Sequence, residues 1–272
     1  GDLQVLEVGG ADEGSACDTQ IDSTTTAIGY SLSSKPSADV TISFSINEPR
    51  LGELCGLTEL TFSPTTWSTE QLLYVASIPN DQDDSSYYAP ALPKFVVSGT
   101  LSSGDPLFSA ASVDDVDVFY IDDDHSEVIV AQLGTVDVEE GGDGAVVELV
   151  LDSQPFGDVT VYLASNDTAN CVLTTGSRLD FSSSNWNEVQ YAEVEAIEDN
   201  VVDDSVYCTI SLIVTSTEDP GYDGLSYGDI VTVHKVNNDV ADFVVDVVGS
   251  QPVLVAPEGG SSLFTLGLSA QP

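Results

Sequence analysis

Short stretches in which apolar and polar residues alternate recur along the whole chain. In Val40–Ile46 every second residue is apolar, which is the pattern of a half-buried strand in an antiparallel sheet. Residues 159–163 repeat this pattern. Gly, Pro, Asn and Asp bound such stretches, and these residues favour turns. Apolar residues rarely recur at the three- to four-residue spacing of a helix, so the pattern predicts an all-β fold.

The same alternation predicts further strands on both sides of the chain's midpoint. They are expected at residues 27–32, 74–78, 94–97, 116–121, 147–151, 192–197, 207–214, 230–236 and 264–268. Short strands separated by turn signals every 8–12 residues or so are typical of a β-sandwich with about seven strands.

The chain repeats itself over the length of a whole domain. Trp67 and Trp186 lie 119 residues apart (186 − 67 = 119), and a phenylalanine and a glutamine recur around them at the same internal spacing. The repeat predicts two complete sandwiches and the first strands of a third. The expected domains are residues 1–124, 125–240 and 241–272.

The charge of the chain is strongly one-sided and excludes two classes of partner. The 272 residues include 46 acidic and 5 basic side chains, for a formal net charge of −41. Binding to nucleic acid or to an anionic membrane surface relies on Lys and Arg, so neither is expected. No apolar run approaches the roughly 18 residues of a membrane span. Bound cations, a saline habitat or a solvated acidic surface remain as explanations of the charge.

Four cysteines are distributed two per repeat. The pairs Cys17–Cys55 and Cys171–Cys208 have separations of 38 and 37 residues (55 − 17 and 208 − 171). We expect a disulfide within each repeat, and hence an oxidising, extracellular location. Asn166 begins an Asn-Asp-Thr glycosylation sequon, which fits that location.

Acidic residues gather at corresponding places in each repeat. These places are a Glu-Gly near the opening strand, an Asp-rich loop after the tryptophan strand, the acidic end of the last strand, and a polar pair after the alternating strand. In a sandwich such loops meet at one end, where each pair of carboxylates 4 Å apart would repel by about 4 kcal/mol at an effective dielectric near 20. Oxygen ligands of this kind suit Ca²⁺. The alternative is that these acids are turn residues on solvated tips.

The order Glu-Gly, Asp-rich loop and closing Ile121-Asp-Asp-Asp-His125 resembles the Calx-β domain of sodium–calcium exchangers, integrin β4 and many extracellular adhesins. The resemblance implies tandem seven-stranded antiparallel Ig-like β-sandwiches that bind Ca²⁺ at one tip. In the first repeat the implied ligands are Glu13, Glu48, Asp81, Asp84, Asp122, Asp123 and Asp124. In the second repeat they are Glu140, Asp167, Glu198, Asp199, Asp203 and Asp239. The second repeat departs from the pattern, because Asn237-Asn238 replaces two of the closing acids.

No complete set of catalytic residues can be recognised in the sequence. Residues 224–228 match the short pattern Gly-x-Ser-x-Gly, but no phosphate-cradling loop occurs, and neither His125 nor His234 has the context of a catalytic triad. We therefore do not expect the protein to be an enzyme. The favoured interpretation is a structural or spacer segment of a long extracellular cell-surface, matrix or appendage protein, with neighbouring repeats as partners and Ca²⁺ stiffening the junctions. The alternatives are an adhesin module that binds a glycan or protein ligand, and a subunit of an extracellular filament built from other copies of the chain.

Overall fold

The computed structural model describes residues 3–7, 17, 24–131, 134–202, 204–247, 258–259 and 264–271. The chain divides into two compact units. Unit 1 comprises residues 1–127, 151–157 and 217–222, and unit 2 comprises residues 128–150, 158–216 and 223–272. The expected domain boundaries at residues 124 and 240 stay a prediction. None of the helices in the described residues is long and apolar enough to cross a membrane.

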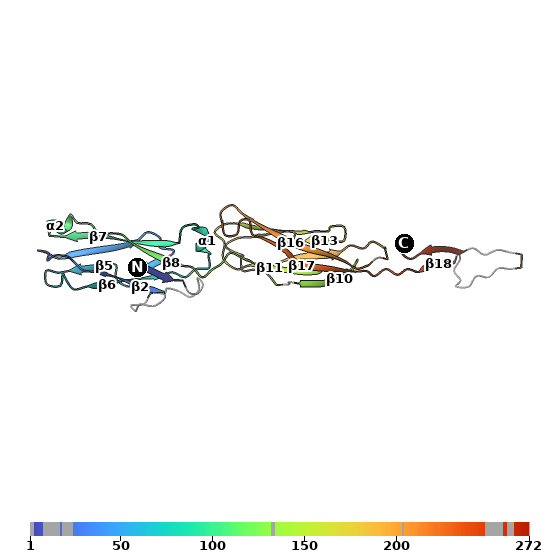
Figure 1. The fold of residues 1–272 in the computed structure, drawn as a ribbon, viewed down its shortest axis with the longest axis horizontal. Coiled ribbons are helices and arrows are strands. Elements are labelled where there is room, and N and C mark those ends of the chain that lie inside the picture. The colour runs from blue at the N-terminus through green and yellow to red at the C-terminus, as the bar shows by residue number, and fades with distance from the viewer. Residues whose placement is uncertain are drawn as a thin grey trace. The chain divides into compact units, whose positions relative to one another are not determined.

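Unit 1 contains two sheets and two very short helices (Figure 1). The larger sheet has the order β1-β8-β7-β3-β5, with strands Leu3–Leu6, Val116–Ile121, Lys94–Ser103, Val40–Ile46 and Glu59–Phe62. The smaller sheet has the order β2-β6-β4, with strands Thr25–Tyr30, Gln71–Ser77 and Gly52–Leu54. The helices are α1 (Asp84–Tyr87) and α2 (Pro106–Ser109).

Unit 2 has the same two-sheet architecture. Its larger sheet has the order β10-β17-β16-β12-β14, with strands Gly134–Glu139, Ser226–Val236, Val206–Ser216, Val159–Ser165 and Arg178–Phe181. Its other sheet has the order β13-β15-β11-β9, with strands Cys171–Thr175, Gln190–Ala196, Ala145–Leu151 and Val128–Val130. A separate hairpin pairs β18 (Phe243–Val247) with β19 (Phe264–Leu268). The prediction of tandem β-sandwiches is therefore confirmed.

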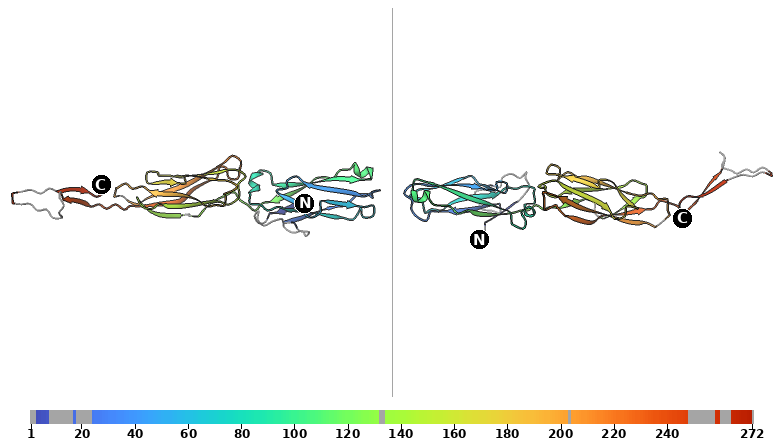
Figure 2. Two further views of the ribbon diagram at one scale, coloured as in Figure 1. Left: turned by 180° about the vertical axis from the view of Figure 1, so that it is seen from behind. Right: turned by 90° about the horizontal axis from the view of Figure 1, so that it is seen from above.

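Alternation of residue types produces the layered core of each unit. On β3 the apolar side chains of Val40, Ile42 and Phe44 are buried. Ile42 and Phe44 belong to a cluster that also contains Leu73 of the smaller sheet and Phe95 of β7. Figure 2 shows the strands of each unit in two layers, and the cluster of unit 1 includes side chains from both of its sheets. Burying such a side chain contributes roughly 1.5–3 kcal/mol, so these faces decide which side of each strand points inward.

One edge strand in each unit runs parallel to its neighbour, in sheets that are otherwise antiparallel. Strand β1 pairs with β8 in parallel, with Leu6 opposite Ile121. Strand β10 pairs with β17 in the same way, with Glu139 opposite Val236. The expectation of a wholly antiparallel sandwich missed this pairing, because a parallel connection joins strands that are distant in sequence. The pairing brings an early strand of each unit beside a late one.

The cysteines form the two disulfides that the sequence predicts. Cys17 is bonded to Cys55, and Cys171 is bonded to Cys208. Cys171 lies on β13 and Cys208 on β16, so the second disulfide joins the two sheets of unit 2.

A glycine on β4 generates the first testable prediction. A Cβ atom built on Gly52 would overlap the ring of Phe95, which is fully buried on β7. Gly52→Ala should therefore destabilise unit 1 by about 1–3 kcal/mol, because the core has no room for the added atom. The measurement is denaturant unfolding followed by Trp67 fluorescence in a Trp186→Phe background.

The matched control is Gly228→Ala on β17, where an added Cβ would meet no atom within 4 Å. Its stability, followed by Trp186 in a Trp67→Phe background, should change by less than about 1 kcal/mol. Equal losses in the two alanine variants would contradict the packing argument.

Candidate functional site

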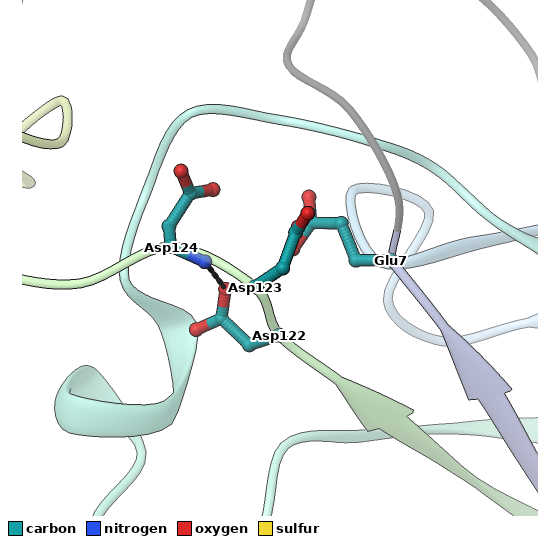
Figure 3. A group of neighbouring side chains, drawn as sticks. All are labelled: Glu7, Asp122, Asp123 and Asp124. Carbon is teal, nitrogen blue, oxygen red and sulfur yellow. Dashed lines mark hydrogen bonds between the residues drawn. The ribbon is translucent and has the colours of Figure 1, made fainter.

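Four carboxylates converge at one end of unit 1 (Figure 3). They belong to Glu7, Asp122, Asp123 and Asp124, and one oxygen from each lies within 4.8 Å of the others. We call these four residues the acidic cluster of unit 1. Glu7 is fully buried and Asp123 is exposed, so the cluster reaches from the protein interior to the surface.

The parallel pairing of β1 and β8 positions this cluster. The N–H of Glu7 donates a 2.7 Å hydrogen bond to the carbonyl of Ile121, the last residue of β8. The three aspartates follow directly, and the run is folded back by a hydrogen bond from the Asp124 N–H to Asp122 Oδ1 at 3.0 Å. The N–H of Ser85 in α1 donates to Asp122 Oδ2 at 2.7 Å. Local hydrogen bonds thus hold the acids together despite their like charge.

Two oxygens of the cluster are buried without a hydrogen-bond partner in the described part of the chain. They are Glu7 Oε2 and Asp124 Oδ2. The other Glu7 oxygen, Oε1, accepts from the Asn80 N–H at 2.5 Å. A buried oxygen with no donor normally costs stability, so such an atom calls for a water or an ion beside it.

The electrostatics of the cluster oppose full ionisation. Burial raises the pKa of Glu7 to about 9. Burial, and then the negative charges of Asp122 and Asp123, raise the pKa of Asp124 to about 7. Burial also raises the pKa of Asp122. A positive ion at this point would reverse each of these effects.

The neighbouring acids of the Asp-rich loop have other partners. Asp84 is buried and forms a 2.6 Å ion pair with Arg50. Asp83 caps α1, because its Oδ1 accepts from the Ser86 N–H at 2.8 Å, and its Oδ2 accepts from the Ser126 N–H at 2.9 Å. These two carboxylates are therefore used to build the loop that surrounds the cluster.

Unit 2 carries a second acidic cluster at the corresponding place. Glu140, Asp199 and Asp239 each bring one oxygen within 4.8 Å of the others, and we call them the acidic cluster of unit 2. The N–H of Glu140 donates to the carbonyl of Val236, the last residue of β17. Glu140 thus holds the position in unit 2 that Glu7 holds in unit 1.

The ammonium of Lys235 lies inside this second cluster. Its Nζ is 2.8 Å from Glu140 Oε2 and 2.6 Å from Asp199 Oδ2, and the lysine side chain is 1% exposed. Glu140 Oε1 also accepts from the Asn238 N–H at 3.1 Å. Burial raises the pKa of Asp239, with the charges of Glu140 and Glu198 adding to the effect.

The structure brings together six of the thirteen acids that the resemblance implies as ligands. Asp122, Asp123 and Asp124 meet in unit 1, and Glu140, Asp199 and Asp239 meet in unit 2. The remaining described acids lie outside both clusters: Glu48, Asp81, Asp84, Asp167 and Glu198. Glu13 and Asp203 fall outside the described residues.

Asp167 is used in its own loop, where Oδ2 accepts a 2.7 Å hydrogen bond from Asn170 Nδ2. Asn166 of the sequon is exposed, and its Oδ1 accepts from the Thr209 N–H at 2.8 Å. Glycosylation at Asn166 stays a prediction.

Glu7 is the residue that sequence reasoning missed. The Glu-Gly pairs at residues 13 and 140 suggested an equivalence that strand pairing does not follow. A different signal was present, because Val5 and Glu7 have the same spacing as Val138 and Glu140. Both valines are buried on edge strands, at 1% and 2% exposure.

Comparison with known proteins gives structural likeness only. No family model matches the chain, and no curated protein matches it. Among solved structures, the chain is similar to the calcium binding domain CBD12 of CALX1.1, with 16% identity, a TM-score of 0.30, and coverage of 79% of this chain and 77% of that one. It is also similar to domains 4 and 5 of the S-layer protein SbsC, with 13% identity, a TM-score of 0.32, and coverage of 72% and 76%. At this level, similarity assigns neither a family nor a ligand.

The acidic cluster of unit 1 generates a pH prediction. A carboxyl whose pKa is higher in the fold than in the unfolded chain binds more protons when folded, so stability falls as pH rises between the two values. For Glu7 that window runs from 4.5 to about 9, and for Asp124 from 3.8 to about 7. In chelator, the unfolding midpoint reported by Trp67 in a Trp186→Phe chain should therefore fall as pH rises from about 5 to about 9.

The Glu7→Gln, Asp124→Asn double variant supplies the control, because it removes both raised groups and keeps the side-chain shapes. Its unfolding midpoint should change less with pH than that of the parent chain over the same pH range. Parallel profiles would show that charge elsewhere in the unit causes the slope.

Proposed function

We propose that unit 1 binds Ca²⁺ through Glu7, Asp122, Asp123 and Asp124, and that the chain is a calcium-stabilised structural repeat segment of an extracellular protein. The observation that carries this proposal is the buried Glu7 Oε2. That atom lies inside a group of four carboxylates, and no hydrogen bond or ion pair to it occurs in the described residues. A bound cation would supply the missing partner.

The chemistry of the donors favours Ca²⁺ over other ions. All four side chains offer oxygen, and Ca²⁺ takes 6–8 oxygen ligands in flexible geometry, completed by carbonyls and water. Mg²⁺ demands closer octahedral geometry and keeps more of its own waters. Transition metals prefer imidazole or thiolate, and the four cysteines of this chain are consumed in disulfides.

The position of the cluster in the sequence supports a structural role. Asp124 precedes Val128, the first residue of unit 2, by only four residues (128 − 124 = 4). An ion held by the three aspartates would fix the conformation of the chain segment that leads into unit 2. The two disulfides fit an oxidising, extracellular compartment. Small-angle X-ray scattering of the chain, with Ca²⁺ and with chelator, tests whether the ion stiffens this segment. A stiffer segment should give a narrower distribution of molecular dimensions when Ca²⁺ is bound.

Calcium should raise the stability of unit 1 by mass action. At a free ion concentration about 100 times the dissociation constant, the gain is about 2.7 kcal/mol, which raises the unfolding midpoint by several degrees. The measurement is thermal unfolding of the Trp186→Phe chain, with Ca²⁺ or with chelator, at equal ionic strength. Mg²⁺ at the same concentration should give a smaller shift.

Glu7→Gln combined with Asp122→Asn should abolish the calcium shift, because two of the four charged ligands are lost. The matched control is Glu48→Gln combined with Asp115→Asn, which removes two charges of unit 1 outside the cluster and should keep the shift. A calcium shift that survives loss of the cluster, or one that Na⁺ of equal ionic strength reproduces, would refute the site.

A further inference from the structure

The two acidic clusters differ in what lies at their centre. In unit 2 the Lys235 ammonium contacts Glu140 at 2.8 Å and Asp199 at 2.6 Å. Lys235 and Glu140 are both buried, with exposures of 1% and 0%. No ion pair between the acidic cluster of unit 1 and a Lys, Arg or His occurs in the described residues, where Arg50 instead pairs with Asp84.

Tyr120 occupies the position of Lys235 in unit 1. The two residues lie 115 apart (235 − 120 = 115), as do the closing aspartates (239 − 124 = 115), and each is the second-last residue of its strand. Tyr120 is also buried, but its hydroxyl is neutral and contacts Asn80 Nδ2 at 2.9 Å. The same strand position thus supplies a positive charge in one unit and none in the other.

The closing run of the last strand also makes unit 2 less negative than unit 1. Where unit 1 has Asp122 and Asp123, unit 2 has Asn237 and Asn238. These amides act as donors, since Asn238 Nδ2 donates to the Glu140 carbonyl at 2.8 Å and Asn237 Nδ2 donates to the Val201 carbonyl at 2.9 Å. The acidic cluster of unit 2 thus holds three carboxylates and one ammonium, against four carboxylates in the acidic cluster of unit 1.

We propose that Lys235 is a built-in counterion that occupies the cation position of unit 2, so that the stability of unit 2 does not depend on divalent ions while that of unit 1 does. The comparison between units rests on the proposed calcium site of unit 1, whereas the ion independence of unit 2 is tested by itself. The ligand class that unit 2 excludes is a small divalent cation.

The geometry gives a physical reason for this exclusion. A lysine ammonium is a compact point charge with three donors, and here it lies within hydrogen-bond distance of two carboxylates. Because the lysine is part of the chain, its local concentration is fixed. A divalent ion could enter only by displacing the ammonium from these two carboxylates. Loss of one member of such a buried pair is strongly destabilising.

The test compares ion responses of the two units within the full chain. Trp186 in a Trp67→Phe background reports unit 2, and Trp67 in a Trp186→Phe background reports unit 1. With Lys235 present, Ca²⁺ in place of chelator should shift the unit 2 midpoint by less than about 1 °C. In a Lys235→Met chain the same exchange should raise the unit 2 midpoint by several degrees, because the emptied group of carboxylates then accepts the ion.

Two further variants keep the test decisive. Arg178→Met removes an exposed positive charge of unit 2, whose partner is Asp180, and should create no calcium response. The double variant Glu140→Gln, Lys235→Met removes both charges of the buried pair. It should therefore fold, but unit 2 should show no calcium response. Calorimetric titration with Ca²⁺ in a Glu7→Gln, Asp122→Asn background should detect binding heat only after Lys235→Met.

A calcium shift of unit 2 with Lys235 in place would overturn the proposal. So would a folded Lys235→Met chain that gives neither a shift nor binding heat. A Lys235→Met chain that folds in Ca²⁺ but not in chelator would support it, and if this chain folds in neither, the response of the parent chain decides. Failure of the proposed calcium site is a separate result, seen as a missing shift at Trp67.

Discussion

Placing an ionised carboxylate out of water is costly unless a positive charge lies beside it, and that constraint shapes the same end of both units. Parallel pairing of β1 with β8 and of β10 with β17 puts Glu7 at the end of β8 and Glu140 at the end of β17. Both glutamates are fully buried. The effective cost of an unpaired buried charge is several kcal/mol, so each unit has to supply a counterion or keep its glutamate protonated.

The two units meet this requirement by different chemistry on one scaffold. Unit 1 surrounds Glu7 with further carboxylates, and its buried Glu7 Oε2 and Asp124 Oδ2 have no hydrogen-bond partner in the described residues, as is also true of Asp239 Oδ2 in unit 2. Unit 2 replaces two acids with amides and inserts the ammonium of Lys235. Because the backbone around the two glutamates is equivalent, the difference lies in a few side chains. Repeats of one architecture can therefore differ in the charges that they gather at one end while the sandwich itself is preserved.

Much of the fold could be predicted from the sequence, because burial of alternate residues leaves a period of two that is visible without neighbours. The closing run Asp122–Asp124 could be found for a similar reason, since its members are adjacent. Glu7 could not be placed in this way, because its parallel pairing joins residues more than a hundred positions apart. Lys235 did carry a signal: it falls in phase with the buried residues Val231 and Val233, at a position where a lysine needs a partner.

The disulfide between Cys171 and Cys208 changes what unit 2 can do under tension. It ties a strand of one sheet to a strand of the other across 37 positions. If the chain is pulled from both ends, the segment between these cysteines cannot be drawn out, even after the sheets separate. At about 3.3–3.6 Å per extended residue, roughly 120–130 Å of contour length stays locked until the bond is reduced. The oxidation state of one bond therefore limits how far this part of the chain can be stretched.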